Sequence, residues 1–285
     1  MEDTLPQSFA VSDCASDAAP VSAASPQERL TWAHTEGLAL PLGVSWIEED
    51  QAFNFAVCAE HAEGVKLFLY SPTDLAKPVL TFQFDAIRNK SGRIWHCRIS
   101  LDQMCDARYY GYSVSGQAVG GLRGFDHEKV LLDPYAKRVF FPPGFDRKRA
   151  MKPGPNNEKA PLGVLPRQRG AFDWAEDLPP RPESDAIIYE LHVNGFTKNP
   201  NSGVHASRAG TYAGLIEKIP YLKNLGITVV ELMPIFQRDP HEGDYWGYMP
   251  LNFFAPHAQY ASSVDNDGQL FEFKNMVKAF HKAGI

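Results

Sequence analysis

The best candidates for ligand chemistry are three aromatic side chains within four positions, Tyr245, Trp246 and Tyr248, with Gly247 between the last two. An aromatic ring can bury an apolar ligand face, while a phenol hydroxyl or an indole N–H hydrogen-bonds to polar groups. These residues end a polar loop that follows a short apolar run at 227–232. Because loops after strand ends build the active sites of α/β proteins, this loop is our candidate ligand site.

The elements around this loop follow from apolar patterning. Residues 227–232 are a β-branched run too short for a buried helix, which indicates a buried parallel strand. Residues 187–193 have a similar apolar pattern and are also predicted to form a buried strand. A helix is expected between the two runs, with Pro220 in its first turn and Gly226 just past its end. Residues 269–283 carry apolar side chains at helical spacing. Alternating strands and helices predict a parallel sheet with crossover helices.

Upstream of this region the hydrophobic pattern has period two. Alternating runs separated by turn-rich segments occupy residues 53–57, 65–69, 79–82, 94–99 and 109–114. Strands of this length and spacing predict an antiparallel, immunoglobulin-like β-sandwich of about 80–100 residues. Cys97 lies on the same alternating face as Trp95 and Ile99, so we expect it to be a reduced thiol in the core.

Amino-acid composition and the spacing of apolar residues divide the chain into segments with different expected structures. They are a disordered leader at 1–34, a β-sandwich at 35–120, a linker at 121–183 and the start of a (β/α)8 barrel at 184–285. We expect the linker to hold little regular structure and to pack across both domains, anchored by Phe172 and Trp174. A complete barrel takes about 250 residues, so the last segment is expected to stop before the third strand. The sequence thus predicts a multi-domain β plus α/β chain that is the front part of a larger protein.

Charge and hydropathy exclude several function classes. The 285 residues carry a net charge of −6 that is spread along the chain, and no basic face for nucleic acid is evident. No apolar run approaches the ~20 residues of a membrane span. The N-terminus lacks a secretory signal, and its first 28 residues contain no Arg or Lys, which argues against a transit peptide. We therefore expect a cytoplasmic protein without nucleic-acid or membrane partners.

The cysteines and histidines give no sign of a metal or cofactor site. The cysteines are Cys14, Cys58, Cys97 and Cys105, and no pair has a metal-ligand spacing. The histidines are likewise scattered without ligand spacing, as at His192, His241 and His257. We predict no metal and no cofactor.

Several motifs closely resemble the isoamylase-type glycogen debranching enzymes of the α-amylase clan. In the predicted barrel they are residues 188–197 (IYELHVNGFT), 210–215 (GTYAGL), 221–226 (YLKNLG), 230–234 (VELMP), 245–248 (YWGY) and 253–256 (FFAP). Residues 41–43, 54–57 and 131–136 look like the N-terminal carbohydrate-binding-type module that these enzymes carry. The resemblance covers about 37–285, and the motifs occur in the family's order.

The resemblance implies hydrolysis of α-1,6 branch linkages in glycogen or a related branched α-glucan, with retention at the anomeric carbon. Retaining hydrolysis uses two carboxyl groups about 5–5.5 Å apart. In this family they lie on later barrel strands, so none can be matched here, and this chain alone is predicted to be inactive. Glu190 and Glu231 fall in strand motifs and are interpreted as structural, and Asp244 is not assigned a catalytic role.

The resemblance also assigns substrate-binding roles within the aromatic loop. Tyr248 matches the family tyrosine that stacks under the sugar at the cleavage point, and Trp246 and Tyr245 are further candidates. The alternative is that these rings pack the loop onto the barrel. Two departures from the family pattern are Asp244, where Asn is common, and Asn194, where many members have Lys or Arg.

Other functions remain open on the sequence alone. The chain could be a non-catalytic α-glucan-binding or regulatory subunit, or part of another enzyme of the clan, such as a trehalose-releasing hydrolase or a branching enzyme. A purely structural fragment is a further alternative. The sandwich is expected to serve packing; the alternative is that it binds glucan through Trp95 or Tyr110.

Overall fold

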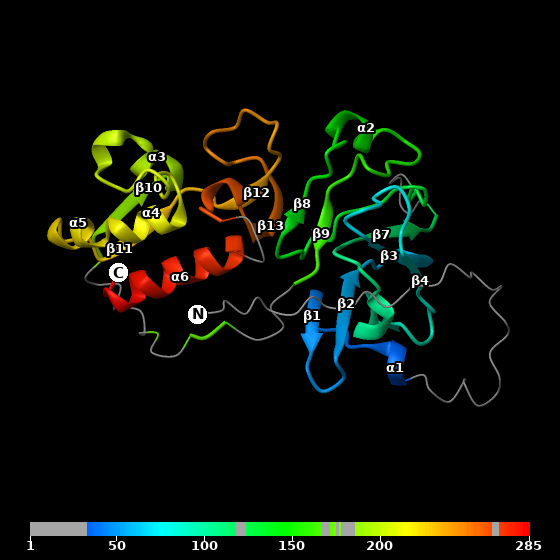
Figure 1. Ribbon diagram of the computed structural model, residues 1–285. Coiled ribbons are helices and arrows are strands. Elements are labelled where there is room, and N and C mark those ends of the chain that lie inside the picture. Colours follow the sequence, from blue (N-terminus) through cyan, green and yellow to red (C-terminus); the bar gives the residue numbers. More distant parts are fainter. Residues whose placement is uncertain (1–32, 118–123, 167–171, 175–176, 178–185, 264–267) are drawn as a thin grey trace, which may run out of the picture.

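The computed structural model describes residues 33–117, 124–166, 172–174, 177, 186–263 and 268–285 (Figure 1). A β-sandwich precedes an α/β unit along the chain, as the period change predicts. Nearly all of the predicted leader, residues 1–32, lies outside the described residues. The short helix α1 (Ala33–Glu36) leads into the sandwich. Within the described residues, no helix has the length and apolar character needed to cross a bilayer.

Two sheets form the sandwich, and their neighbouring strands pair antiparallel wherever a register is defined. The first has the order β1 (Gly43–Ile47), β2 (Ala52–Cys58), β6 (Ile94–Ser100), β5 (Lys90–Ser91). The second has the order β4 (Leu80–Gln83), β3 (Gly64–Tyr70), β7 (Tyr109–Ser115), β9 (Leu162–Val164), β8 (Val139–Phe140). A 3-10 turn, η2 (Leu101–Met104), follows β6. The strands expected from alternation are therefore confirmed, and β1, β5, β8 and β9 are additions to them.

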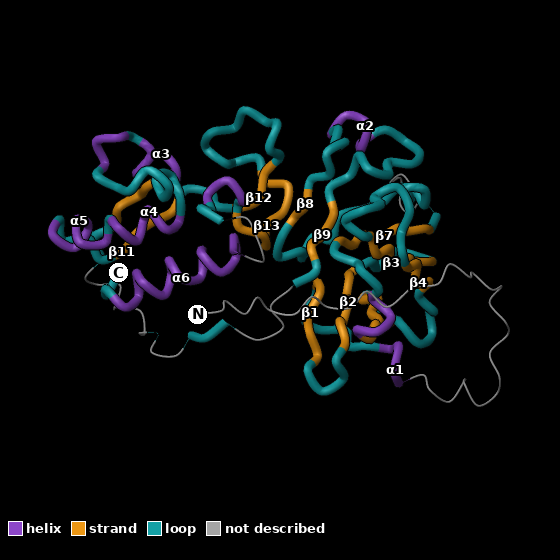
Figure 2. Tube along the Cα trace, viewed as in Figure 1, coloured by secondary structure: helices purple, strands orange, loops and turns teal. Residues whose placement is uncertain are grey.

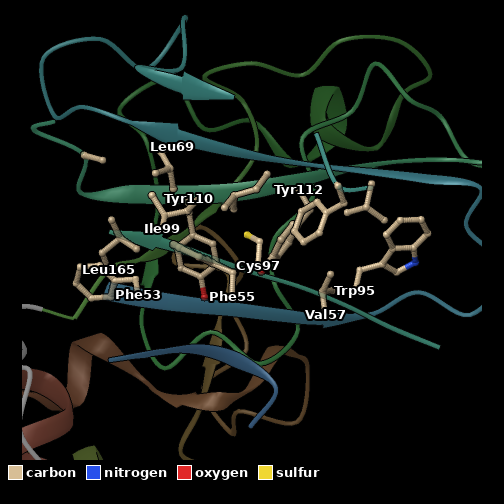
Figure 3. Close-up of a cluster of buried hydrophobic side chains, with 14 of the residues drawn as sticks. Phe53, Phe55, Val57, Leu69, Trp95, Cys97, Ile99, Tyr110, Tyr112 and Leu165 are labelled. Carbon is tan, nitrogen blue, oxygen red and sulfur yellow. The ribbon is translucent and has the colours of Figure 1, made fainter. Parts of the chain in front are cut away.

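The alternating residues of the two sheets meet in one core (Figure 3). Phe55 pairs in register with Cys97, and Phe55 also packs edge-on against Tyr110 with ring centroids 5.5 Å apart. Cys97 is fully buried, and burial raises the pKa of its thiol well above the ordinary value. Trp95 and Tyr110 are also 0% exposed. The alternative in which these two rings bind glucan is therefore wrong, because both are enclosed between the sheets.

The segment interpreted as a linker contributes to the sandwich. Of residues 121–183, β8 and β9 join the second sheet beyond β7, and the ring of Phe140 stacks on that of Tyr109 at 3.9 Å. These strands are only two and three residues long, too short to show alternation in the sequence. A short helix, α2 (Arg147–Met151), lies between them. Further along, Phe172 packs edge-on against Phe271 with centroids 5.6 Å apart, which ties this part of the segment to the following α/β unit.

The α/β unit is built on the parallel pair β10 (Ile188–Leu191) and β11 (Val229–Leu232). The expectation that these runs lie side by side and point the same way is confirmed, since Ile188 pairs with Val229 and Leu191 with Leu232. The helices are α3 (Val193–Lys198), α4 (Tyr212–Glu217), α5 (Ile219–Asn224) and α6 (Gly268–Lys282), with 3-10 turns η4 (Pro200–Ser202) and η5 (Ala258–Tyr260). Gly226 has a φ of +85°, which suits its predicted place after α5.

Two details of this unit differ from expectation. The first strand ends at Leu191 rather than at 193, because the His192 side chain accepts the backbone N–H of Gly195 and caps α3. The strands are also not fully buried, since Ile188 is 59% exposed. The reason is that β10 and β11 form a sheet of only two strands among the described residues, so part of their surface has no covering layer.

A hairpin that the sequence pattern does not predict follows the parallel pair. It consists of β12 (Phe236–Arg238) and β13 (Pro250–Pro256), which pair antiparallel with two shifts in register. The irregular register explains why no alternation marks it in the sequence. Figures 1 and 2 show the hairpin on the side of the α/β unit that faces β8 and β9 of the sandwich.

Candidate functional site

The candidate site is the aromatic loop, defined here as residues 239–249, which connects β12 to β13. The β12–β13 hairpin that carries this loop follows the C-terminal end of β11, the edge at which α/β barrels carry their active sites. All three predicted ligand-binding rings lie on the loop and are available to solvent, with exposures of 51% for Tyr245, 58% for Trp246 and 62% for Tyr248. The rings differ in what supports them.

Tyr245 is supported by a histidine from the end of β10. Its ring stacks on that of His192, with centroids 4.2 Å apart and planes 17° from parallel. His192 Nε2 donates to the Tyr245 carbonyl at 2.8 Å, and His192 Nδ1 accepts the Gly195 N–H at 3.0 Å. This pattern requires a neutral imidazole with its proton on Nε2. One face of the Tyr245 ring is thus covered by His192, so this residue helps to hold the loop in place as well as forming part of it.

Glycine at position 195 makes that stacking possible. A Cβ added there would lie 2.4 Å from the Tyr245 hydroxyl oxygen. A side chain at this position would therefore push the ring off His192. Trp246 forms a T-shaped pair with Tyr245, with ring centroids 6.3 Å apart, and stays 58% exposed.

A buried polar network backs the histidine. Arg238 Nη1 donates to the Tyr260 hydroxyl at 3.0 Å, and that hydroxyl lies 2.9 Å from His192 Nε2. Gln237 Nε2 donates to His257 Nδ1 at 3.2 Å, which makes His257 neutral as well. Burial, helped by the Arg238 charge, lowers the pKa of His257 to about 4. Burial also lowers the pKa of His192, although its hydrogen bond to the Tyr245 carbonyl acts in the opposite direction.

Tyr248 is the most exposed of the three rings, and no ring of a described residue packs against it. The backbone on both sides of it is tightly held. Gly247 has a φ of +86°, and a Cβ there would lie 2.8 Å from the Pro234 carbonyl oxygen. Asp244 Oδ2 accepts the Met249 N–H at 2.9 Å, which closes the loop around the motif. The Tyr248 ring is therefore exposed to solvent on a backbone whose conformation is fixed on both sides.

Two carboxylates on the parallel strands, and any group of side chains able to bind a metal, are the other features that could do chemistry here. Glu190 and Glu231 lie opposite each other in register on β10 and β11 and are exposed. Both occupy the strand positions that the sequence motifs predict. Within the described ranges, no three His, Cys, Asp or Glu side chains are grouped so that they could hold a metal ion.

Sequence reasoning missed the supporting network. The linear spacing of the histidines matches no ligand pattern, yet His192 and Tyr260 meet across 68 positions. The available signal is that His192 lies near the C-terminal end of a predicted strand, from which a side chain reaches the loops at that edge.

Comparison with known proteins connects both parts of the chain to one family. Residues 41–136 match carbohydrate-binding module 48 (isoamylase N-terminal domain), and residues 190–285 match the α-amylase catalytic domain. Isoamylase 3, chloroplastic, from Oryza sativa subsp. japonica is 38% identical over 272 residues, covering 88% of this chain and 34% of that protein. The glycogen operon protein GlgX homolog of Haemophilus influenzae is 33% identical over 270 residues, covering 88% of this chain and 38% of that protein.

Solved structures have the same fold. The product complex of the multi-modular glycogen-degrading pneumococcal virulence factor SpuA aligns with a TM-score of 0.64 at 25% identity, covering 90% of this chain and 27% of that one. Type I pullulanase from Bacillus subtilis aligns with a TM-score of 0.63 at 24% identity, covering 90% and 33%, and supports the fold alone. The chain spans about a third of the length of the curated relatives it matches. It belongs to the isoamylase/GlgX debranching enzyme family, with a module 48 β-sandwich followed by part of the α-amylase catalytic domain.

Proposed function

We propose that this protein acts in debranching glycogen or a related α-glucan, by hydrolysis of α-1,6 branch linkages. Family membership supports the reaction class, and the chemistry of the aromatic loop supports a sugar ligand. The observation that carries the proposal is Tyr248, which is 62% exposed on the loop between β12 and β13 and on which no ring of a described residue stacks. A glucose ring has an apolar C–H face that such a ring can cover while the sugar hydroxyls reach polar neighbours.

The three rings have distinct proposed roles. Tyr248 stacks on the sugar at the cleavage point, and Trp246 contacts an adjacent sugar. Tyr245 lines the site with its free edge and holds the loop through His192. Burying one aromatic side chain contributes roughly 1.5–3 kcal/mol. Loss of the Tyr248 ring is therefore expected to weaken glucan binding about tenfold or more.

The hydrolytic step needs a nucleophile and an acid/base, two carboxyl groups about 5–5.5 Å apart in a retaining enzyme. No described residue is assigned to either role. We propose that later barrel strands, present in the longer relatives, provide both groups. The 285-residue chain is then expected to bind glucan without cleaving it.

The binding half of the proposal is tested with the 285-residue chain and maltoheptaose, by calorimetry and by Trp fluorescence. Tyr248→Ala should lower affinity about tenfold while the melting temperature stays within a degree or two, since the ring is exposed. Tyr221→Ala is the matched control, because Tyr221 is 49% exposed on α5, away from the loop. Equal affinity of Tyr248→Ala and the unsubstituted chain would remove Tyr248 from the site.

The catalytic half is tested by incubating glycogen with the 285-residue chain and, separately, with a longer form carrying the complete barrel. Linear chains released only by the longer form support the proposal. Glycogen binding by the longer form with no new reducing ends would instead support a non-catalytic binding subunit. Release of trehalose, or formation of new branches, would assign another reaction of the clan.

A further inference from the structure

We propose that the sandwich holds the aromatic loop at both of its ends and thereby positions the glucan-binding rings. The role assigned to the sandwich is positioning, not sugar binding, and its consequence for affinity rests on the proposed function above. The contacts involved come from two short segments, residues 133–137 and 145–147, which follow β7 in the chain.

The first holding point is Asn252 on β13, just after the loop. Its side chain is 2% exposed, and Nδ2 donates to the carbonyl oxygens of Asp133 at 3.2 Å and Pro134 at 3.1 Å. Its Oδ1 accepts the backbone N–H groups of Phe254 and Ala255, both at 2.8 Å. All four hydrogen-bonding positions of this amide are therefore used. Asn252 fixes the end of the loop to a turn that belongs to the sandwich.

That turn is itself fixed to the core of the sandwich. Asp133 is 0% exposed; its Oδ2 accepts the hydroxyl of Tyr110 on β7 at 2.8 Å and its Oδ1 accepts the Tyr135 N–H at 2.8 Å. The Tyr135 ring stacks on Phe254, with centroids 4.4 Å apart and planes 22° from parallel. A continuous series of contacts thus runs from a core strand of the sandwich to the strand that ends the aromatic loop.

The second holding point is at the start of the loop. Arg147 Nη1 lies 2.6 Å from Glu242 Oε1 and 3.9 Å from Asp239 Oδ2. Beside this pair, the ring of Phe145 stacks on His241 with centroids 5.5 Å apart. Exposed ion pairs contribute little alone, but here the charge pair and the ring pair fix adjacent loop residues together. Tyr245, Trp246 and Tyr248 all lie between the two holding points.

Holding both ends shortens the segment that is free to move. Released at one end, the loop samples more conformations, and a ligand must then order it on binding. Removing a holding contact should therefore weaken glucan binding although no holding residue touches the sugar. The expected loss is several-fold, smaller than the loss on removing the Tyr248 ring.

The test measures amide hydrogen exchange of residues 239–254 in the 285-residue chain without ligand. Arg147→Ala and Tyr135→Ala should each speed exchange in this segment several-fold, with exchange in β2, β3 and β6 unchanged. Arg208→Ala is the matched control, because Arg208 also forms an exposed ion pair, with Glu217 at 3.1 Å, but one remote from the loop. Tyr135→Phe keeps the stacking ring and should behave like the unsubstituted chain.

Two readouts separate this inference from the proposed function. If loop exchange responds to Arg147→Ala and Tyr135→Ala, the positioning role is supported whether or not maltoheptaose binds. If the unsubstituted chain binds no maltoheptaose, the proposed function fails on its own account. Unchanged loop exchange in both variants would overturn the positioning role, even if the chain binds glucan.

Discussion

His192 illustrates, at the scale of single residues, how an exposed ring can be held by buried polar groups. Its ring faces Tyr245, its Nδ1 caps α3, and its Nε2 meets both the Tyr245 carbonyl and the Tyr260 hydroxyl. The Nδ1 contact requires the neutral imidazole, because a protonated Nδ1 could not accept the Gly195 N–H, and the nearby Arg238 charge favours the same state. The network thus combines one buried cation with neutral histidines, an arrangement that acid disturbs.

His257 gives this acid sensitivity a testable form. Its pKa falls from 6.5 to about 4 in the folded protein, so the unfolded chain takes up the proton first as the pH drops. The associated stability is complete above pH 6.5 and is lost as the pH falls toward about 4, by about 3 kcal/mol at most. His257→Gln should flatten the dependence of the unfolding free energy on pH between 6.5 and 4, as measured by urea titrations.

Comparing the His257→Gln variant with the unsubstituted protein separates the effect of His257 from that of the other titrating groups. Burial raises the pKa of Asp133 to about 6, so Asp133 makes the protein less stable as the pH rises toward 6, the opposite slope. Because both proteins carry Asp133, its contribution cancels in the difference. Identical slopes for the two proteins would show that His257 does not titrate in this range.

The aromatic loop shows, at the scale of an element, that backbone conformation sets where the rings point. Gly247 lies between Trp246 and Tyr248 with a φ of +86°, and a Cβ would meet the Pro234 carbonyl oxygen at 2.8 Å and Arg238 Nη1 at 3.0 Å. Both the left-handed backbone and the close approach favour glycine. Gly243, in the same loop, meets nothing within 4 Å.

These two glycines make a matched pair of substitutions. Gly247→Ala should displace the adjacent rings, lower maltoheptaose affinity about tenfold, and destabilise the fold by roughly 1–3 kcal/mol. Gly243→Ala should leave both quantities within error. Calorimetric titration and thermal melting measure them. Unaltered binding by Gly247→Ala would mean that the backbone at this position does not set the geometry of the rings.

The whole molecule has separate large hydrophobic cores, one in each unit. The sandwich cluster includes Leu67, and the cluster of the α/β unit includes Leu222; both side chains are 0% exposed. The units meet through polar contacts and ring stacking at Asn252 and Phe254 rather than through a shared apolar core. Their stabilities should therefore be partly independent.

Leucine truncation in each core tests this independence. Leu67→Ala and Leu222→Ala should each cost about 2–5 kcal/mol in their own unit. Local hydrogen exchange should rise in β2, β3, β6 and β7 for the first, and in α4, α5 and α6 for the second. If either substitution raises exchange equally in both units, the two units unfold as one.

The sandwich strands and the parallel pair β10–β11 can be predicted from residue order alone, because alternation and short β-branched runs are local consequences of burial on one face or two. Residue order also places Tyr245, Trp246 and Tyr248 on a loop after a strand. Only the tertiary structure showed that His192 supports Tyr245, that Asn252 joins Asp133 across 119 positions, and that β8 and β9 extend the sandwich. A hydrogen bond or a stacked ring between distant residues leaves no periodic trace in the chain, since it depends on how complete elements pack.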